Sequence, residues 1–395
     1  MRIALIDTRP KLKTYSLPLL KIGAWRKSIG DECVLFSNKV PEENGFDEAW
    51  VTTCFTFNIK NALNLAVRAG KKVKKVKIGG IAATLIPEYF ENMGLEVHRG
   101  LLHEAENIAP DYSLLGEVPS YSISHTSRGC LRSCKFCMVP KLEPEFINRK
   151  NWEIDLIPGA KSILFYDNNW LAKDHDDFKD DIKKLHKLVN AKKITKIDFN
   201  QGLDCRLLTQ EKAELLKGLP IDPVRFAFDN MGEDGHFQKA VKALASLGFQ
   251  RFSYYALYNF LDTPQDFYYR IKQGALLSQE KKVEVEVFPM RYQPILEVDR
   301  NRNYVGKYWT PKKRAAFLSI IASHSCSGQI SARGGSLMEP VEEFEYWFGK
   351  NDEEFNRLLS YPDIRKLSQR KREKLRLKRH GKAGGSIPTL PLQVS

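Results

Sequence analysis

The sequence predicts an α/β protein with a flavodoxin-like (doubly wound) N-terminal domain, a partial (βα)6 TIM-type barrel and a mainly helical C-terminal region. Two blocks of short apolar runs that alternate with amphipathic segments carry this prediction, because such alternation is typical of parallel sheets covered by helices. A length of 395 residues corresponds to roughly two to three domains. With 43% hydrophobic and 28% charged residues, the chain has the composition of a globular protein and not of a disordered one.

The first block spans residues 1–110 and is predicted to form the doubly wound domain. Glycines follow its amphipathic segments and mark their ends. Residues 111–120 are predicted to be a linker, since 103–120 contain two prolines and few periodic apolar positions. The predicted strands are Arg2–Ile6, Glu32–Phe36, Ala49–Thr52, Val73–Ile78 and Leu95–His98, and the predicted helices are Ser16–Ser28, Lys60–Ala69 and Ile86–Met93.

The second block spans residues 121–292 and repeats the alternation of strand and helix six times. This pattern predicts a parallel barrel, or an open part of one, with ligands at the carboxyl ends of the strands. Thr209 and Thr263 are predicted helix N-caps. The predicted strands are Tyr121–Thr126, Ser162–Tyr166, Ile194–Phe199, Val224–Phe228, Arg251–Leu257 and Val283–Phe288, and the predicted helices are Asp174–Val189, Gln210–Lys217, Gly235–Leu247 and Pro264–Leu276.

The rest of the chain is predicted to divide into a helical region, residues 293–364, and a basic, partly disordered tail, residues 365–395. Its composition becomes rich in glycine and proline near the end, which is typical of disorder at a terminus. We predict helices at Ala315–Ala322 and Pro340–Leu359, a loop at Ile330–Ser336 and disorder after His380.

The positive charge is concentrated in the tail. Between Arg365 and Lys382 stand ten Lys or Arg and one Glu, a net charge of +9 against +14 for the whole chain. Such a tail is suited to phosphates or to another acidic surface. A solvated, frayed helix explains the same composition, so both interpretations stay open at this point.

The sequence also predicts the compartment. No apolar stretch approaches the roughly 18 residues of a membrane helix, and MRIALIDTRP has the pattern of a strand and not of a signal peptide. Seven cysteines in a chain of this length do not form a secreted disulfide framework, and three of them are crowded together. We therefore expect a cytoplasmic protein with no membrane partner.

The stretch HTSRGCLRSCKFCMVP places Cys130, Cys134 and Cys137 directly after the first predicted strand of the second block. Three thiolates on one short loop are suited to three corners of a cubane iron–sulfur cluster, and one iron is left for a small molecule because no fourth cysteine lies nearby. Flanking basic side chains favour thiolates and an anionic cluster. Structural zinc, which usually takes four closed ligands, and inert core thiols are the alternatives.

The stretch GCLRSCKFC resembles the cluster-binding motif of the radical S-adenosylmethionine (SAM) superfamily, including the aromatic Phe136 before the third cysteine. The resemblance implies a [4Fe-4S] cluster on the three cysteines, with the amino and carboxylate groups of SAM on its fourth iron. It also implies reductive cleavage of SAM to methionine and a 5′-deoxyadenosyl radical that abstracts hydrogen from a substrate. The family fold is a partial (βα)6 barrel with this loop after its first strand, and its six strands agree with the six predicted above.

By strand order, the resemblance implies further SAM contacts at the ends of later strands. Asp167 and Asn168 follow the second strand and supply acceptors for the methionine amino group. Asn200 and Arg206 follow the third strand, where an arginine is suited to the SAM carboxylate. The other cofactor-binding positions that the resemblance implies are Phe136 on the cysteine loop, Asp229 near the ribose and Met290 near the adenine.

The segments SLPLLKIGAWRKSIGDECVLF and IGGIAATLIPEYF resemble parts of the N-terminal domain of the cobalamin-binding radical SAM class. Together with the barrel, this resemblance covers about residues 1–292. The first block has no Asp-x-His-x-x-Gly motif, so a histidine ligand to cobalt is not expected. Some members of the class bind cobalamin without that motif. Cobalamin binding therefore stays open, and we favour a domain that has lost the cofactor.

VTTCFTFNIKNAL and CKFCMVP resemble segments of the tRNA and ribosomal methylthiotransferases. Those enzymes hold a second cluster with three N-terminal cysteines, whereas this block has only Cys33 and Cys54. Methylthiotransfer is therefore not expected, although the kinship keeps RNA in view as a substrate. We interpret Cys205 as a small buried residue, and Cys326 with His324 as too weak a pair to predict a site.

We therefore expect a radical SAM enzyme that acts on an unidentified substrate, with an electron donor such as flavodoxin or ferredoxin as a partner. A cobalamin-dependent radical SAM methyltransferase is the first alternative. The second is a non-catalytic, metal-stabilised nucleic-acid-binding protein that docks through residues 365–382. The basic tail keeps a nucleic acid or a nucleotide-bearing molecule in view as the substrate.

Overall fold

The computed structural model describes residues 1–9, 14–298, 303–324, 330–332 and 338–379. Contacts between residues divide the chain into two compact units, which do not coincide with the domains predicted above; those boundaries stay predictions. Unit 1 consists of Met1–Ala227, Leu247–Phe249 and Tyr292–Tyr304, and unit 2 consists of Phe228–Ser246, Gln250–Arg291 and Val305–Ser395.

Unit 1 begins with a five-stranded sheet in the order β2-β1-β3-β4-β5. Every neighbouring pair in it is parallel. This is the flavodoxin-like strand order, so the structure confirms the predicted doubly wound sheet. The strands are β1 (Arg2–Asp7), β2 (Glu32–Ser37), β3 (Glu48–Thr52), β4 (Lys75–Gly79) and β5 (Glu96–Val97).

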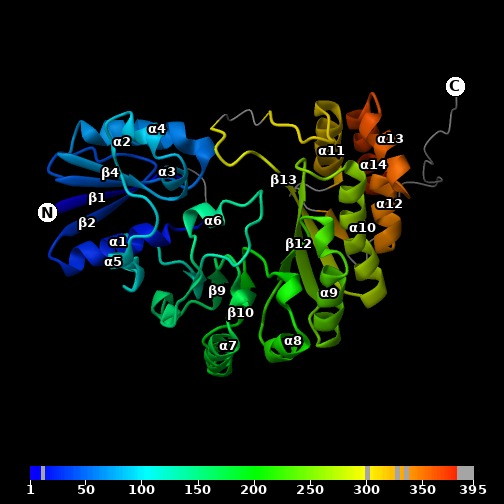
Figure 1. The fold of residues 1–395 in the computed structure, drawn as a ribbon, viewed down its shortest axis with the longest axis horizontal. Helices are drawn as coiled ribbons and strands as arrows, with labels where there is room; N and C mark the ends of the chain where they lie inside the picture. The colour runs from blue at the N-terminus through cyan, green and yellow to red at the C-terminus, as the bar shows by residue number, and fades with distance from the viewer. Residues whose placement is uncertain (10–13, 299–302, 325–329, 333–337, 380–395) are drawn as a thin grey trace. The chain divides into compact units, whose positions relative to one another are not determined.

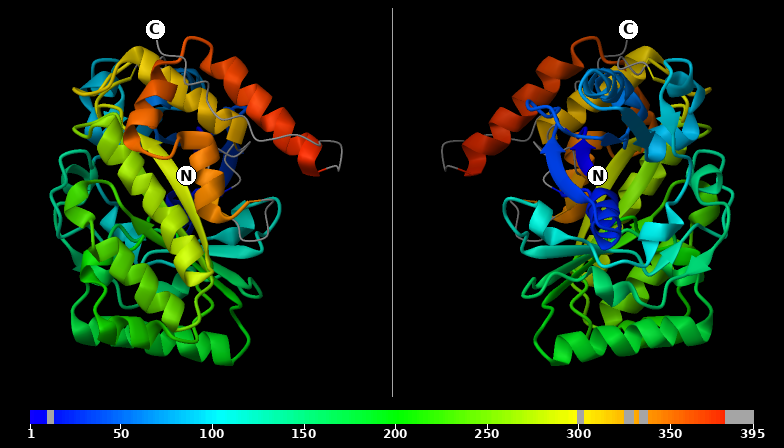
Figure 2. Two further views of the ribbon diagram at one scale, coloured as in Figure 1. Left: turned by 90° about the vertical axis from the view of Figure 1, so that its right-hand side faces the viewer. Right: turned by 90° about the vertical axis from the view of Figure 1, so that its left-hand side faces the viewer.

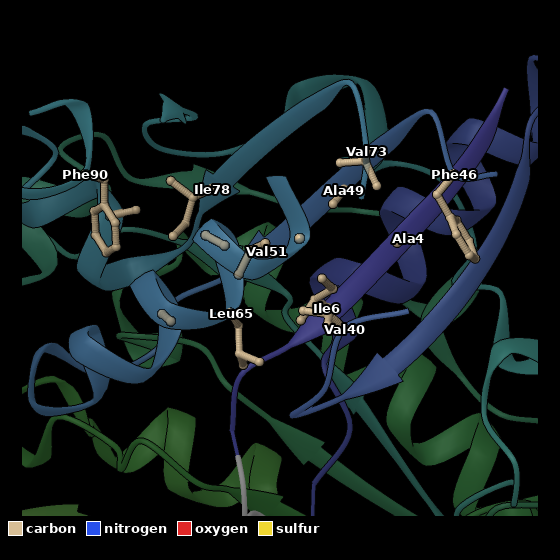
Figure 3. Close-up of a cluster of buried hydrophobic side chains, with 14 of the residues drawn as sticks. Ala4, Ile6, Val40, Phe46, Ala49, Val51, Leu65, Val73, Ile78 and Phe90 are labelled. Carbon is tan, nitrogen blue, oxygen red and sulfur yellow. The ribbon is translucent and has the colours of Figure 1, made fainter. Parts of the chain in front are cut away.

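Helices cover both faces of this sheet (Figure 1). On one face lies α2 (Ile59–Gly70), whose buried alanines and leucine meet Ala4 and Ile6 of β1 in the cluster shown in Figure 3. On the other face lies α1 (Leu17–Ser28), which packs on Ile3 and Leu5. Because alternate residues of β1 meet different helices, the strand is apolar at every interior position.

A second parallel sheet of unit 1, in the order β10-β9-β6, carries the cysteine loop. Isolated parallel bridges, Ile197↔Ile221 and Leu203↔Phe226, extend it toward β11. The strands and helices of this part are β6 (Tyr121–Ser124), β9 (Ser162–Phe165), α7 (His175–Asn190), β10 (Lys196–Phe199), α8 (Gln210–Leu216) and β11 (Val224–Ala227). The predicted cap Thr209 is confirmed, since its side chain accepts a hydrogen bond from Lys212 N.

Unit 2 contains the parallel pair β12–β13 and the antiparallel strand β14. Thr263 caps α10 in a reciprocal capping box with Asp266, as predicted. The elements are α9 (His236–Ser246), β12 (Arg251–Tyr258), α10 (Pro264–Lys281), β13 (Glu284–Arg291), α11 (Pro311–His324), β14 (Ile330–Ala332), α12 (Pro340–Phe348), α13 (Asp352–Ser360) and α14 (Ile364–Arg379).

Three sequence predictions were wrong in detail. Of the helix expected over 86–93, only α4 (Glu88–Glu91) is helical, and a further short helix that was not expected, α3 (Ile81–Leu85), precedes it. The helix expected over 340–359 is divided into α12 and α13. The loop expected over 330–336 begins instead with strand β14; its residues 333–336 lie outside the described part of the chain, as do Cys326 and the side chain of His324.

The basic segment forms a regular helix, α14, drawn in red in Figure 2. It packs against α11 and α13. The helix in the interpretation of a solvated, frayed helix is confirmed for 364–379, but its contacts with α11 and α13 show that it is not frayed or solvated on all sides. Among the helices that the structure describes, none combines the length and the apolar character that crossing a membrane requires.

Candidate cluster site on the cysteine loop

The cysteine loop leaves the carboxyl end of β6. Its neck is closed by two short antiparallel strands, β7 (Ser127–Arg128) and β8 (Ile147–Asn148). Cys130, Cys134 and Cys137 stand between them, and all three are half-buried. None of the six described cysteines forms a disulfide. The fold thus presents three thiols on one closed loop at the end of a strand, where ligands of parallel sheets bind.

Gly129 allows the chain to turn into this loop. Its φ is +74°, in the left-handed region that favours glycine. A Cβ atom at this position would stand 2.0 Å from the carbonyl oxygen of Glu145, which is backbone and cannot move aside cheaply. The N–H of Gly129 donates to Glu143 Oε2 at 2.7 Å. The start of the loop is therefore held against its end by a contact that only glycine permits.

Glu143 ties the loop to its surroundings. Its Oε2 also accepts from Asn168 Nδ2, at 2.7 Å, and its Oε1 lies 3.4 Å from a guanidinium nitrogen of Arg128. Arg128 in turn makes a two-pronged pair with Glu106, with N–O distances of 2.8 and 3.0 Å. A single carboxylate thus connects both ends of the cysteine loop with the segment after β9.

Nitrogen donors face the sulfur atoms. Cys130 Sγ accepts from the N–H of Arg132 at 3.4 Å and from Asn169 Nδ2 at 3.5 Å. Cys137 Sγ accepts from the N–H of Val139 at 3.5 Å. Such donors stabilise a thiolate and the negative charge of a metal cluster bound to it, and they favour the deprotonated ligand form.

These donors fit a cluster with three protein ligands. A single zinc ion needs every ligand atom around one point, about 2.3 Å away for sulfur. Among the described residues, no three His, Cys, Asp or Glu side chains are gathered in that way. A cubane cluster makes a different demand, because each thiolate binds its own iron at a separate corner. Three separate thiols on one loop suit this demand, and the placement of Cys130, Cys134 and Cys137 at three corners of a cubane cluster stays a prediction.

Asp204 is a site residue that the sequence analysis missed. It follows β10 and accepts from the Arg132 Nε of the cysteine loop at 2.9 Å and from the Arg206 Nε at 2.7 Å. Burial raises the pKa of Asp204, but the hydrogen bonds from Arg206 and Arg132 outweigh it and hold the pKa below its usual value. The carboxylate therefore stays ionised and joins the loop to the segment after β10.

Asp167, a predicted SAM contact, is buried with an exposure of 4%. Both of its oxygens accept from the N–H of Thr126, and Oδ1 also accepts from the hydroxyls of Thr126 and Ser127 at 2.7 Å. Burial raises its pKa, and these hydrogen bonds oppose the shift. The carboxylate holds the turn that leads from β6 into the cysteine loop. A direct contact with SAM stays a prediction.

The other predicted positions of unit 1 lie around the same strand ends. Asn168 is half-buried and bound to Glu143, and Arg206 is bound to Asp204 through two nitrogens. Asn200 is half-buried at the end of β10, where its N–H donates to Phe165 O at 3.0 Å. Phe136 is half-buried on the cysteine loop.

The predicted contacts Asp229 and Met290 belong to unit 2. Asp229 Oδ1 accepts from the N–H of Leu257 at 3.0 Å, and Met290 on β13 is 47% exposed. Arg270 is fully buried and donates to the carbonyl oxygens of Phe228 and Leu257 at 2.9 and 2.8 Å. The sequence did not predict this guanidinium as a site residue. It holds the backbone next to Asp229 against the carboxyl end of β12.

A buried ion network joins α1 to the second sheet. Asp155 has no exposed surface, and its carboxylate meets Lys21 Nζ at 2.9 Å and the guanidinium of Arg149. Ser124 of β6 donates to the same carboxylate at 2.9 Å. Burial lowers the pKa of Lys21, and Asp155 opposes the shift. The network anchors the strand from which the cysteine loop departs.

The carboxyl edge of the first sheet is where a doubly wound sheet binds ligands. Here its polar groups bind one another: Thr8 Oγ1 donates to Thr52 O at 2.8 Å, and Asn58 Nδ2 donates to Thr8 O at 2.8 Å. The residues that directly follow β1, β3 and β4 include no histidine. His98 directly follows β5 at the same edge of the sheet. A cobalamin bound over β1, β3 and β4 would therefore take no histidine from the ends of these three strands.

A cavity of about 740 Å³ lies beside the neck of the cysteine loop. Lys77 and His98 line it from the first sheet, and Arg128 and Glu143 line it from the loop. Its volume lies within the roughly 300–1,000 Å³ of small-molecule sites. Cys205 is buried and its Sγ lies 3.8 Å from Ala227 O, which agrees with the interpretation of a small buried residue.

No protein-family model matches the chain, and no curated protein matches it significantly. Among solved structures, the radical S-adenosylmethionine methyltransferase TsrM from Kitasatospora setae, with cobalamin and a [4Fe-4S] cluster bound, matches 75% of this chain and 76% of its own, with a TM-score of 0.57 and 11% identity. TsrM with its tryptophan substrate and a SAM analogue (aza-SAM) matches 74% and 73%, with a TM-score of 0.54 and 11% identity. The predicted resemblance is confirmed at the level of the fold, which this chain shares with TsrM over 75% of its length.

Proposed function

We propose that this protein is a radical SAM enzyme in which Cys130, Cys134 and Cys137 hold a [4Fe-4S] cluster and SAM is cleaved reductively to start radical chemistry. The observation that carries the proposal is the closed loop of three thiols, with N–H donors on two of the sulfurs, at the end of β6. The likeness of the fold to TsrM supports it. When bound, the cluster supplies the electron that cleaves SAM.

The chain's own residues position the reactants in this proposal. Glu143 and Asp167 keep the loop in shape from its two sides. Asn168, Asn200 and Arg206 are the proposed SAM contacts of unit 1, and an arginine matches a carboxylate with two parallel hydrogen bonds. The electron comes from a small redox protein of the flavodoxin or ferredoxin type.

Electron paramagnetic resonance of the reduced, anaerobically reconstituted protein tests the proposal. We expect about four iron atoms per chain and a [4Fe-4S]⁺ signal that changes when SAM is added. The variant Cys134→Ala is expected to lose this signal and the formation of 5′-deoxyadenosine.

The matched control is Cys33→Ala, which removes a buried thiol from the core of the first sheet. It is expected to keep both the signal and the change with SAM. Zinc in place of iron, or a cluster signal that is indifferent to SAM, would refute the proposal.

Cobalamin-dependent methyl transfer is a second candidate function. The observations that favour it are the 2-1-3-4-5 sheet and the likeness to a structure of TsrM that contains cobalamin. Protein produced with cobalamin and purified anaerobically should then retain an equimolar amount, seen in its visible absorbance. Loss of all cobalamin on gel filtration, with SAM cleavage intact, would leave only the first function.

The remaining alternative, a non-catalytic nucleic-acid-binding protein with a structural metal, receives no support from the comparisons. The two TsrM structures that share the fold are those of a radical S-adenosylmethionine methyltransferase, and one of them contains a [4Fe-4S] cluster. We therefore keep nucleic acid only as a partner of an enzyme.

A further inference from the structure

Helix α14 has two sides with different roles, although most of its residues are basic. Its docked side includes Lys371, which is 7% exposed. The Nζ of Lys371 donates to the carbonyl oxygen of Tyr346 and lies over the ring of that tyrosine, 5.1 Å from its centre. The hydroxyl of Tyr346 donates back to Lys371 O at 3.1 Å. The helix is thus fixed on unit 2 by one of its own cations.

The opposite side of α14 is exposed and strongly positive. Because a helix turns once in about 3.6 residues, its exposed positions fall within one continuous arc. Within that arc, Glu373 is the one acidic residue. The exposed basic residues are Arg365, Lys366, Arg370, Arg372 and Arg376.

We propose that this side of α14 binds the phosphodiester backbone of a nucleic acid. From Arg365 to Arg376 the arc extends about 16 Å along the helix axis. One nucleic-acid strand presents a phosphate about every 3.4 Å of axis, or roughly five phosphates over that length. Over the same length the surface offers five cations and the carboxylate of Glu373, which lies 4.0 Å from Arg376, so its net charge of +4 is close to the charge of the phosphates. The proposal rests on α14 alone and does not depend on the chemistry proposed for the cysteine loop.

The composition of the arc favours phosphates over other acidic partners. Four of its five cations are arginines, and a guanidinium matches a phosphate with two parallel hydrogen bonds. A helix that lies on a membrane needs an exposed apolar face. Here Ile364 is buried and Leu367 and Leu375 are half-buried, and only Leu377, 37% exposed, points outward among the described apolar residues of the helix. The geometry therefore points to a nucleic acid and not to a lipid surface.

The test is fluorescence anisotropy with the full, reconstituted chain and a labelled single-stranded RNA, with an RNA duplex and a DNA duplex of the same sequence as further arms. For about five phosphate contacts, Kd should rise about a hundredfold between about 50 and about 200 mM salt. The variant R365Q/K366Q/R370Q/R376Q should bind at least about tenfold more weakly at the lower salt, and its slope of log K against log salt should be smaller in magnitude by about 3. Whichever arm binds most tightly identifies the kind of nucleic acid.

The matched control removes four exposed lysines of unit 1, as K71Q/K74Q/K150Q/K193Q, with the same change in net charge. It should keep nearly all of the affinity. Equal weakening by both variants, absence of binding in every arm, or preferential binding to anionic phospholipid vesicles would overturn the proposal. The α14 variant should retain the cluster signal and SAM cleavage, so a failure here is distinct from a failure of the proposed enzyme activity.

Discussion

At the scale of single residues, Gly129 decides whether the cysteine loop can close. We predict that Gly129→Ala lowers the iron bound after reconstitution severalfold. The added Cβ would meet the carbonyl oxygen of Glu145 at 2.0 Å, and alanine at a positive φ adds about 1–2 kcal/mol of strain. The measurements are iron per chain and the free energy of unfolding of the protein without its cluster.

Gly159 provides the matched control for this prediction. Its φ is +85°, but no atom lies within 4 Å of a Cβ built there. Gly159→Ala should therefore show only the strain of the backbone, about 1–2 kcal/mol, and keep its iron. Equal loss of iron in the two variants would contradict the role of the contact with Glu145.

Local sequence pattern located the three cysteines, because their spacing is contained within eight residues. It did not reveal Glu143 or Asp204, whose partners come from distant segments: Asn168 for the first and Arg132 for the second. The signal that could have found Asp204 is its place two residues before Arg206, at the end of a predicted strand. Asp167 was predicted to contact SAM. Its hydrogen bonds to Thr126 and Ser127 could not be predicted, because these partners lie about forty residues earlier in the chain.

At the scale of elements, α14 is predicted to make stability depend on pH through Lys371. Burial lowers the pKa of Lys371 to about 8 in the folded protein, against about 10.4 in an unfolded chain. Between these values the unfolded state binds more protons, so stability rises with pH, and below pH 8 the cost of the buried charge is fully present. Between pH 7 and pH 10, the free energy of unfolding of the natural chain should therefore rise by about 2 kcal/mol relative to that of Lys371→Met, whose side chain does not titrate.

Urea unfolding at several pH values measures this difference. The control is Lys366→Met, which removes a cation from the exposed side of the same helix. Its pH dependence should parallel that of the natural chain, since this side chain lies in water in both states. A difference between Lys371→Met and the natural chain that stays constant with pH would show that Lys371 is not desolvated.

Periodicity predicted most elements because each strand and helix has its own local pattern. For example, β10 was expected at 194–199 and lies at Lys196–Phe199. Two of the failures involve single residues that interrupt a regular pattern. Pro87 separates α3 from α4, and Gly349 separates α12 from α13 with a φ of +90°. The pattern on either side of such a residue continues, so hydrophobic spacing alone does not show the break.

At the scale of the whole molecule, unit 1 combines two sheets that the sequence assigned to separate domains. The apolar cluster around Leu17 and Leu20 of α1 includes Ile123 of β6. Lys21 reaches Asp155, and Tyr15 accepts a hydrogen bond from the N–H of Ile123 at 2.6 Å. The local composition of 111–120 predicts a linker. Local composition does not predict contacts between residues more than a hundred positions apart, such as those of Tyr15 with Ile123. The two sheets of unit 1 should therefore unfold as one cooperative body.

Asp155→Asn tests this cooperativity. It leaves Lys21 and Arg149 buried without their shared carboxylate, which should cost about 3–5 kcal/mol. Native-state hydrogen exchange should then show equal losses of protection in β1 and in β9, because opening either sheet opens the other. Asp180→Asn, which removes an exposed partner of Lys184 at 3.0 Å, should change protection by at most about 1 kcal/mol. If Asp155→Asn weakens β9 but leaves β1 unchanged, the first sheet is an independent domain, and the boundary at residue 110 holds.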